Sequence, residues 1–203
     1  MPPTEEILVP FRAATSVLGV ATKCKSTLIV SSVRAMKDHG HLDAYVAKLE
    51  PREKDTVLGC IAGTWITMAA AVAHYSACNA LGLSVAEQVR MGAAVADRIH
   101  QSLLNTVVRI AAGAGADPWT ALAHFHKFYD RMFDRGGTSV VKVGPKDARV
   151  EIVGLPLAGI PYFVNAYRGV IQKGGELFAT RAFVTVLPKY ASPTSLAFRI
   201  AWA

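Results

Sequence analysis

Charged residues are missing from one long stretch of the chain. From Thr56 to Ala86, 31 consecutive residues include no Asp, Glu, Lys or Arg. A membrane-spanning helix needs about 20 strongly apolar residues. Much of this stretch is Ala instead, and it carries polar residues such as His74 and Asn79. We therefore expect a central helix that protein encloses on most sides, and no membrane span.

Cysteine is also scarce, and its spacing excludes two classes of small domain. Cys24, Cys60 and Cys78 are odd in number and far apart, with no CxxC pair, so neither a disulfide scaffold nor a zinc site is expected. The first eleven residues contain two acids and no basic region, which is unlike a secretory signal. These features predict a cytoplasmic protein with reduced thiols.

The length and composition of the chain favour one domain with a large core. The chain has 203 residues, of which 52% are hydrophobic and 18% charged, and the charged share is below the usual quarter. This depletion indicates many buried helices or an apolar interface with a second copy. The net charge is +7, but the basic residues are scattered and the largest local group is Arg12, Lys23 and Lys25. We expect ordinary surface charge and no nucleic-acid binding.

Periodicity and turn residues divide the chain into segments. Residues 1–25 are weakly patterned and are predicted as an N-terminal arm, and residues 26–203 as one domain. The β-branched run at 26–33 predicts a short strand. The helical region, about 34–134, is predicted to contain helices at 34–39, 41–49, 51–82, 84–112 and from 118 to shortly before residue 136.

Capping residues support the starts of three of these helices. Pro51 suits the first turn of the long uncharged helix. Ser84 and Glu87 have the spacing of a capping box. Asp117 is expected to cap the helix that begins at Pro118.

The hydrophobic period changes to two after the helices, in the region 138–203. Segments 139–143 and 148–153 read as a hairpin, with Arg149 and Glu151 as a surface pair. A helix at 160–172 and strands at 181–187 and 196–202 follow. The fold class is therefore α+β: an N-terminal helical bundle followed by a β-β-α-β-β antiparallel sheet with a helix on one face.

Several segments carry a family resemblance. These are TLIVSSVRAMKDHG, LGCIAGTWITMAAAVAHY, LGLSVAEQVRMG, KVGPKDARVEIVGLPLAGIPYFVNAYRGVI and the closing TSLAFRIAWA. Over about residues 26–203 the chain resembles a bacterial family of unknown function that was first collected as a paralogous set in Myxococcus. More distantly, it is similar to four-vinyl-reductase (hydrocarbon-binding) domains, TRAPP-type subunits and haem-nitric-oxide domains.

The distant resemblances imply an apolar pocket between helices and sheet, a small hydrophobic ligand, and a homodimer formed through helices. Haem-nitric-oxide domains carry a Tyr-x-Ser-x-Arg signature for the haem propionates. This chain has Tyr190, Ser192 and Thr194 in those positions, in a turn, and lacks the Arg. The cofactor therefore stays unknown, and haem is not expected.

Catalytic and metal signatures are missing. His124 and His126 point to different sides of a helix, and no carboxylate or Cys completes a metal set with His39 and His41. There is no GxSxG motif and no Cys beside a His. We predict no enzyme and no metal site.

Aromatic residues on two predicted helices could instead line a pocket, with a few polar groups converging on it. Such residues ordinarily pack in the hydrophobic core. They form a pocket only if the space between them is left unfilled. The candidate ligand-binding residues are Trp65, His74, Tyr75, Asn79, Trp119, His126 and Tyr129.

Two functions remain open from the sequence. The first is a non-enzymatic cytoplasmic regulatory or sensory module that binds a small hydrophobic ligand between helices and sheet and has a protein partner. The alternative is a homodimeric interaction or scaffold module without a ligand, in which the apolar helix forms the dimer interface.

Overall fold

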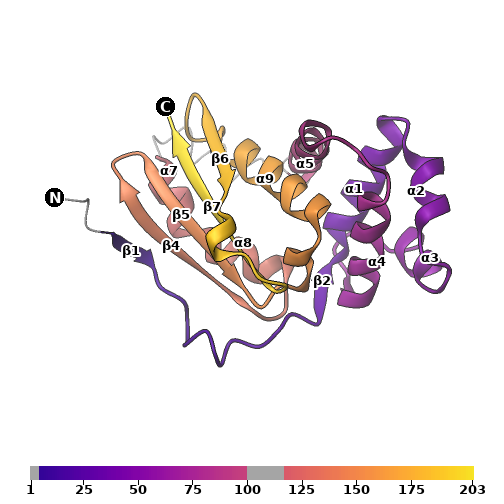
Figure 1. Ribbon diagram of the computed structural model, residues 1–203, viewed down its shortest axis with the longest axis horizontal. Helices are drawn as coiled ribbons and strands as arrows, with labels where there is room; N and C mark the ends of the chain where they lie inside the picture. The colour runs from indigo at the N-terminus through magenta and orange to yellow at the C-terminus, as the bar shows by residue number, and fades with distance from the viewer. Residues whose placement is uncertain (1–4, 100–116) are drawn as a thin grey trace.

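A computed structural model of the chain describes residues 5–99 and 117–203. The sheet lies at one end of the molecule and α1 to α4 at the other, with α9 between them (Figure 1). The helices are α1 (Ser26–Asp38), α2 (Leu42–Lys48), α3 (Pro51–Leu58), α4 (Met68–Asn79), α5 (Val85–Ile99), α7 (Pro118–Ala123), α8 (Phe125–Met132) and α9 (Pro161–Gly175), with short 3-10 turns at Pro156–Gly159 and Pro188–Tyr190. The strands are β1 (Glu6–Val9), β2 (Lys23–Lys25), β3 (Trp65–Thr67), β4 (Gly137–Gly144), β5 (Asp147–Val153), β6 (Ala182–Val186) and β7 (Ser195–Trp202).

The predicted β-β-α-β-β order is confirmed. Strands β4 and β5 form the expected hairpin, α9 follows, and β6 and β7 close an antiparallel sheet of order β1-β4-β5-β7-β6. Val150 lies opposite Val140 and Phe198, and all three are fully buried. Strand alternation places Arg149 and Glu151 on the other face, where they form the predicted ion pair at 2.6 Å.

The N-terminal segment contributes strands that the sequence analysis missed. Strand β1 lies within the predicted arm and pairs with β4 at the sheet edge. Strand β2 ends that arm and pairs with β3, so that Lys25 lies opposite Trp65. Strands of three or four residues are too short to show a clear alternation of apolar and polar residues. The strands with which they pair also lie far along the chain.

The predicted strand at 26–33 is wrong, because the segment belongs to α1. Leu28, Ile29, Ser32, Ala35 and Met36 are buried at helical spacing. Helix α1 contacts α5 and α2. Burial of this face outweighs the β propensity of the Ile and Val residues, which is a weak preference.

The predicted helix over 51–82 is interrupted, and this is a second correction. Helix α3 ends at Leu58, strand β3 follows a turn, and α4 begins at Met68 with the Thr67 side chain as its cap. Gly63 has φ of 88°, a conformation that an uninterrupted helix cannot contain. Ile61 and Trp65 lie four residues apart within the predicted helix, yet they are 74% and 43% exposed. The enclosed part is α4, which is buried on most of its sides.

The cap predictions for α5 and α7 are confirmed. The backbone N–H of Ser84 donates to the Glu87 carboxylate, and the Glu87 N–H donates to the Ser84 hydroxyl. Asp117 accepts from the Thr120 N–H at 2.9 Å. Helix α5 is described to Ile99, so its predicted continuation to 112 lies outside the described residues. The predicted helix after Asp117 has a break at His124, which separates α7 from α8.

Candidate functional site

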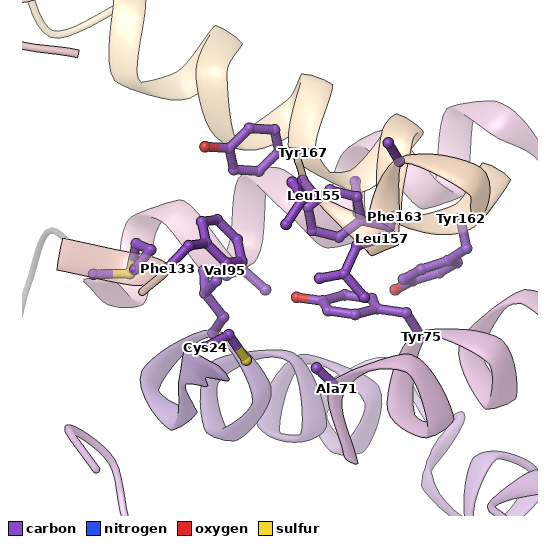
Figure 2. Packing of buried hydrophobic residues seen from close by; sticks show 14 of the residues in the cluster. Cys24, Ala71, Tyr75, Val95, Phe133, Leu155, Leu157, Tyr162, Phe163 and Tyr167 are labelled. Atoms are coloured by element: carbon purple, nitrogen blue, oxygen red, sulfur yellow. The ribbon is translucent and has the colours of Figure 1, made fainter. Parts of the chain in front are cut away.

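The interior has an aromatic cluster where α4 and α9 meet. The rings of Tyr75 and Phe163 are 4.9 Å apart and edge-on, and those of Phe163 and Tyr167 are stacked at 5.2 Å. Tyr162 lies beside Tyr75 at 6.4 Å. Figure 2 shows these four rings with Leu155 and Leu157 between the two helices. All four aromatic residues are buried, so this junction is largely filled by side chains.

A polar chain adjoins the cluster within the helices. The hydroxyl of Tyr45 and Nδ1 of His74 lie 2.6 Å apart, and His74 Nε2 lies 3.7 Å from the Sγ of Cys78. Burial lowers the pKa of His74 to about 3, so this imidazole is neutral at physiological pH. Burial also raises the pKa of the Cys78 thiol. These groups hold one another in place, and they are not poised for acid–base or nucleophilic chemistry.

A small cavity opens where α1, α4, α5 and α9 converge. Its volume is about 20 Å³, which is room for about one water molecule. Tyr167, one of its lining residues, has a buried hydroxyl without a hydrogen-bond partner. The lining residues are Leu28, Ser32, Tyr75, Met91, Gly92, Val95, Tyr162, Phe163, Ala166, Tyr167 and Val170.

Of the residues predicted to bind a ligand, the three on α4 lie at or near this junction. Tyr75 lines the cavity, and His74 belongs to the neighbouring polar chain. The Oδ1 of Asn79 accepts from the Tyr162 N–H at 3.1 Å, so Asn79 caps the first turn of α9. This hydrogen bond therefore links α4 to α9.

The other four predicted residues lie elsewhere. Trp119 packs edge-on against Trp202, with 4.7 Å between ring centroids. The Tyr129 hydroxyl donates to the Arg135 carbonyl at 3.0 Å. Trp65 lies at the surface beside Lys25, and the Nδ1 of His126 is buried without a partner. The structure therefore does not bring the seven residues together around one cavity, and their role in ligand binding stays a prediction.

Sequence reasoning missed the contribution of α9. Tyr162, Phe163, Ala166 and Tyr167 recur at helical spacing and form the buried face of that helix. This signal was present in the predicted helix at 160–172, but nothing in the sequence placed α9 against α4. Among the described residues, no three His, Cys, Asp or Glu side chains are placed to hold a metal ion.

Solved structures resemble this arrangement. The crystal structure of the Fe(II) unliganded H-NOX protein from K. algicida matches with a TM-score of 0.60 at 14% identity, over 88% of this chain and 96% of that chain. The chain has an H-NOX-like fold. A structure from work on haem distortion in the H-NOX family matches this fold with a TM-score of 0.58 at 10% identity, over 88% of this chain and 94% of that chain. Another, from work on H-NOX activation, has a TM-score of 0.56 at 11% identity, over 88% and 96% of the two chains.

These likenesses establish the H-NOX-like fold alone, because the identities are low. The expected distant similarity to haem-nitric-oxide domains is confirmed at this level. No family model and no curated protein matches the chain, so membership of the myxobacterial family stays a prediction. Within 5–99 and 117–203, none of the helices combines the length and the apolar character needed to cross a bilayer.

Proposed function

We propose that the protein is a non-enzymatic sensory or regulatory module that binds a small, mostly apolar ligand at the junction of α1, α4, α5 and α9. The observation that carries this proposal is the small cavity at this junction, which is lined almost entirely by apolar and aromatic side chains.

The cavity limits the ligand to a few heavy atoms. Its walls are mainly apolar and aromatic, with hydroxyls from Ser32 and three Tyr residues. A ligand larger than the roughly 20 Å³ cavity would have to displace side chains, of which Met91 is the most adaptable. We therefore expect affinity to depend on how readily Met91 changes rotamer.

Haem is the group that the H-NOX-like fold implies, and it does not fit the described interior. The junction between the helices and the sheet is filled by Tyr75, Phe163 and Tyr167, and the cavity there is far smaller than a porphyrin. Of the histidines in the described ranges, only His74 is fully buried, and both of its ring nitrogens face Tyr45 and Cys78. We assign no role to haem in the proposed function.

The proposal of a non-enzymatic role rests on the lining of the cavity. It includes no Asp, Glu, His, Lys, Arg or Cys side chain. Burial raises the pKa of Tyr75, Tyr162 and Tyr167, so these hydroxyls stay protonated at physiological pH. The groups at the site can bind and orient a molecule, but they offer no general base.

A cavity-enlarging substitution tests the ligand site. Met91→Ala should open space beside Tyr75 and increase the affinity for benzene, as engineered apolar cavities do. The measurement is the benzene-dependent rise in unfolding temperature. Leu122→Ala, a truncation of a buried residue outside the cavity lining, is the matched control. Equal benzene stabilisation of both variants would contradict a ligand site at the junction.

A second candidate function is a homodimeric interaction module, as the sequence analysis left open. The filled interior supports it, and so do the exposed apolar side chains of Leu58 and Ile61 near the end of α3. We propose this surface as the contact with a second copy in a reducing cytoplasm. Light scattering of Ile61→Asp against the unchanged protein tests it. A loss of dimer mass supports the interaction module, and identical monomer masses contradict it.

A further inference from the structure

The exposed face of the two-stranded β2–β3 ribbon gathers basic and aromatic side chains. Alternation along the ribbon buries Cys24 and Ile66 and turns Lys23, Lys25 and Trp65 to the other side. The Nζ of Lys25 lies 4.3 Å from the centroid of the Trp65 ring. Lys25, one of the three residues of the largest local basic group in the sequence, therefore contacts an exposed indole.

A groove of about 440 Å³ lies beside this face. This volume is within the range of small-molecule sites, about 300–1,000 Å³. Its walls come from segments far apart in the sequence, which the isolated bridge between Cys24 and Phe133 brings together. The lining residues are Arg12, Lys23, Trp65, Asp130, Phe133 and Asp134.

The polar groups along the groove differ in how many hydrogen bonds they already make within the protein. Asp134 accepts three hydrogen bonds, from the Thr22 N–H and hydroxyl and from the Lys23 N–H, so it is part of the framework. Arg12 donates to the Gly136 carbonyl at 2.7 Å and to Asp130 at 3.3 Å.

Two groups remain open to a ligand. Within the described residues, the ammonium of Lys23 has no ion-pair or hydrogen-bond partner. Trp65 is 43% exposed, with the Lys25 ammonium over one face of its indole. An exposed ring beside a free cation is suited to a ligand that joins a planar ring to an anion.

We propose that this groove binds a nucleoside phosphate. The base stacks on the Trp65 indole, the phosphate lies between Lys23 and Arg12, and Asp130 accepts from a ribose hydroxyl. Stacking on an indole suits any base, because every base has a π face. Cations provide the charge that a phosphate requires. The site is separate from the interior cavity and does not depend on the function proposed for that cavity.

A free nucleotide fits this groove better than a nucleic-acid strand does. Strand binding uses several aromatic platforms along a continuous basic path. Here, Trp65 supplies a single aromatic platform among the residues that line the groove, and Asp130 and Asp134 lie at its side. The basic residues elsewhere in the sequence form no run that would extend the path.

Isothermal titration of the full chain with AMP tests the proposal, with adenosine and inorganic phosphate as separate probes. We expect saturable AMP binding that weakens as salt is raised. Trp65→Ala should weaken it roughly 5- to 150-fold, the range for loss of one stacked base. Lys23→Glu should also weaken it, whereas Lys146→Glu, the same charge change on an exposed turn residue, should not.

Three results would overturn the proposal. One is the absence of saturable AMP binding up to about 10 mM. Another is adenosine binding as tightly as AMP, because the phosphate would then contribute nothing. The last is equal weakening by Lys146→Glu and Lys23→Glu, which would show non-specific attraction to positive charge. Circular dichroism of each variant checks that the fold is retained.

Discussion

The backbone of Gly92 lies directly against the carbonyl oxygen of Ala166, where α5 crosses α9. A Cβ atom at position 92 would be 1.8 Å from that oxygen. The reverse contact is similar, because a Cβ at Gly169 would be 2.1 Å from the Val89 carbonyl oxygen. Glycine on both helices thus lets the two backbones touch, and this crossing closes one side of the interior cavity.

The crossing predicts that Gly92→Ala is strongly destabilising. The added methyl group meets backbone, which cannot rotate away, so we expect a loss at or above the usual 1–3 kcal/mol for overpacking. Urea unfolding measures it. Gly174→Ala is the matched control in α9, because a Cβ there meets nothing within 4 Å. It should be neutral or stabilising, since Ala favours helix by about 1 kcal/mol. Equal losses in both variants would contradict the close crossing.

The buried His74 predicts a loss of stability in mild acid. The unfolded chain binds a proton at the ordinary pKa of 6.5, whereas the folded chain does so only near 3. The unfolded state therefore takes up more protons as pH falls from 6.5 towards 3, and this favours unfolding. The slope from this group approaches about 1.4 kcal/mol per pH unit below 6.5.

Urea unfolding of the unchanged protein and of His74→Gln at pH 7.5 and 5.5 measures this contribution. The variant should be less stable at pH 7.5, because it loses the contact with Tyr45, but its stability should depend less on pH. The same pH dependence in both proteins would show that other groups are responsible.

The contact of Asn79 with the first turn of α9 predicts a cap effect across two helices. Asn79→Ala removes the acceptor for the Tyr162 N–H, and we expect a loss of about 1 kcal/mol, as for an ordinary N-cap. Asn79→Asp keeps an acceptor oxygen and places a negative charge at a helix N-terminus, so most of the stability should remain. Thermal unfolding compares the two, and an unaffected Asn79→Ala would refute the capping role.

The unpartnered hydroxyl of Tyr167 predicts that its removal increases the stability of the fold. Tyr167→Phe removes a buried polar group that has no hydrogen bond, so stability should rise by up to about 1 kcal/mol. Tyr129→Phe is the contrasting variant, because its hydroxyl donates to Arg135, and it should lose about 1 kcal/mol. A loss in Tyr167→Phe as large as that in Tyr129→Phe would indicate that the Tyr167 hydroxyl has a partner in solution.

Much of the fold was predictable because its signals are local. The hairpin of β4 and β5, the caps at Ser84 and Asp117, and the helical spacing in α9 all depend on residues within a few positions of one another. Apart from the break at His124 and the missed strands of the N-terminal segment, the predictions that were wrong concern the segment from Ser26 to Thr67. There, long-range packing turned a β-branched run into α1, and pairing with β2 interrupted the uncharged helix at β3.

In the candidate sites too, the sequence identified individual residues but not the long-range contacts that place them. The sequence identified Tyr75 and Trp65 as notable aromatic residues and Arg12, Lys23 and Lys25 as a basic group. It could not show that Tyr75 faces the cavity while Trp65 faces a groove at the surface.

The sequence by itself determined the α+β class, the order of the C-terminal elements and the apolar character of α4, because periodicity and capping act between near neighbours. Tertiary structure alone decided which faces meet. The crossing at Gly92, the joining of β2 to both β3 and residue 133, and the aromatic filling of the interior depend on contacts between segments far apart in the chain. Such contacts form only when whole surfaces are buried together, and no local pattern in the sequence specifies their partner.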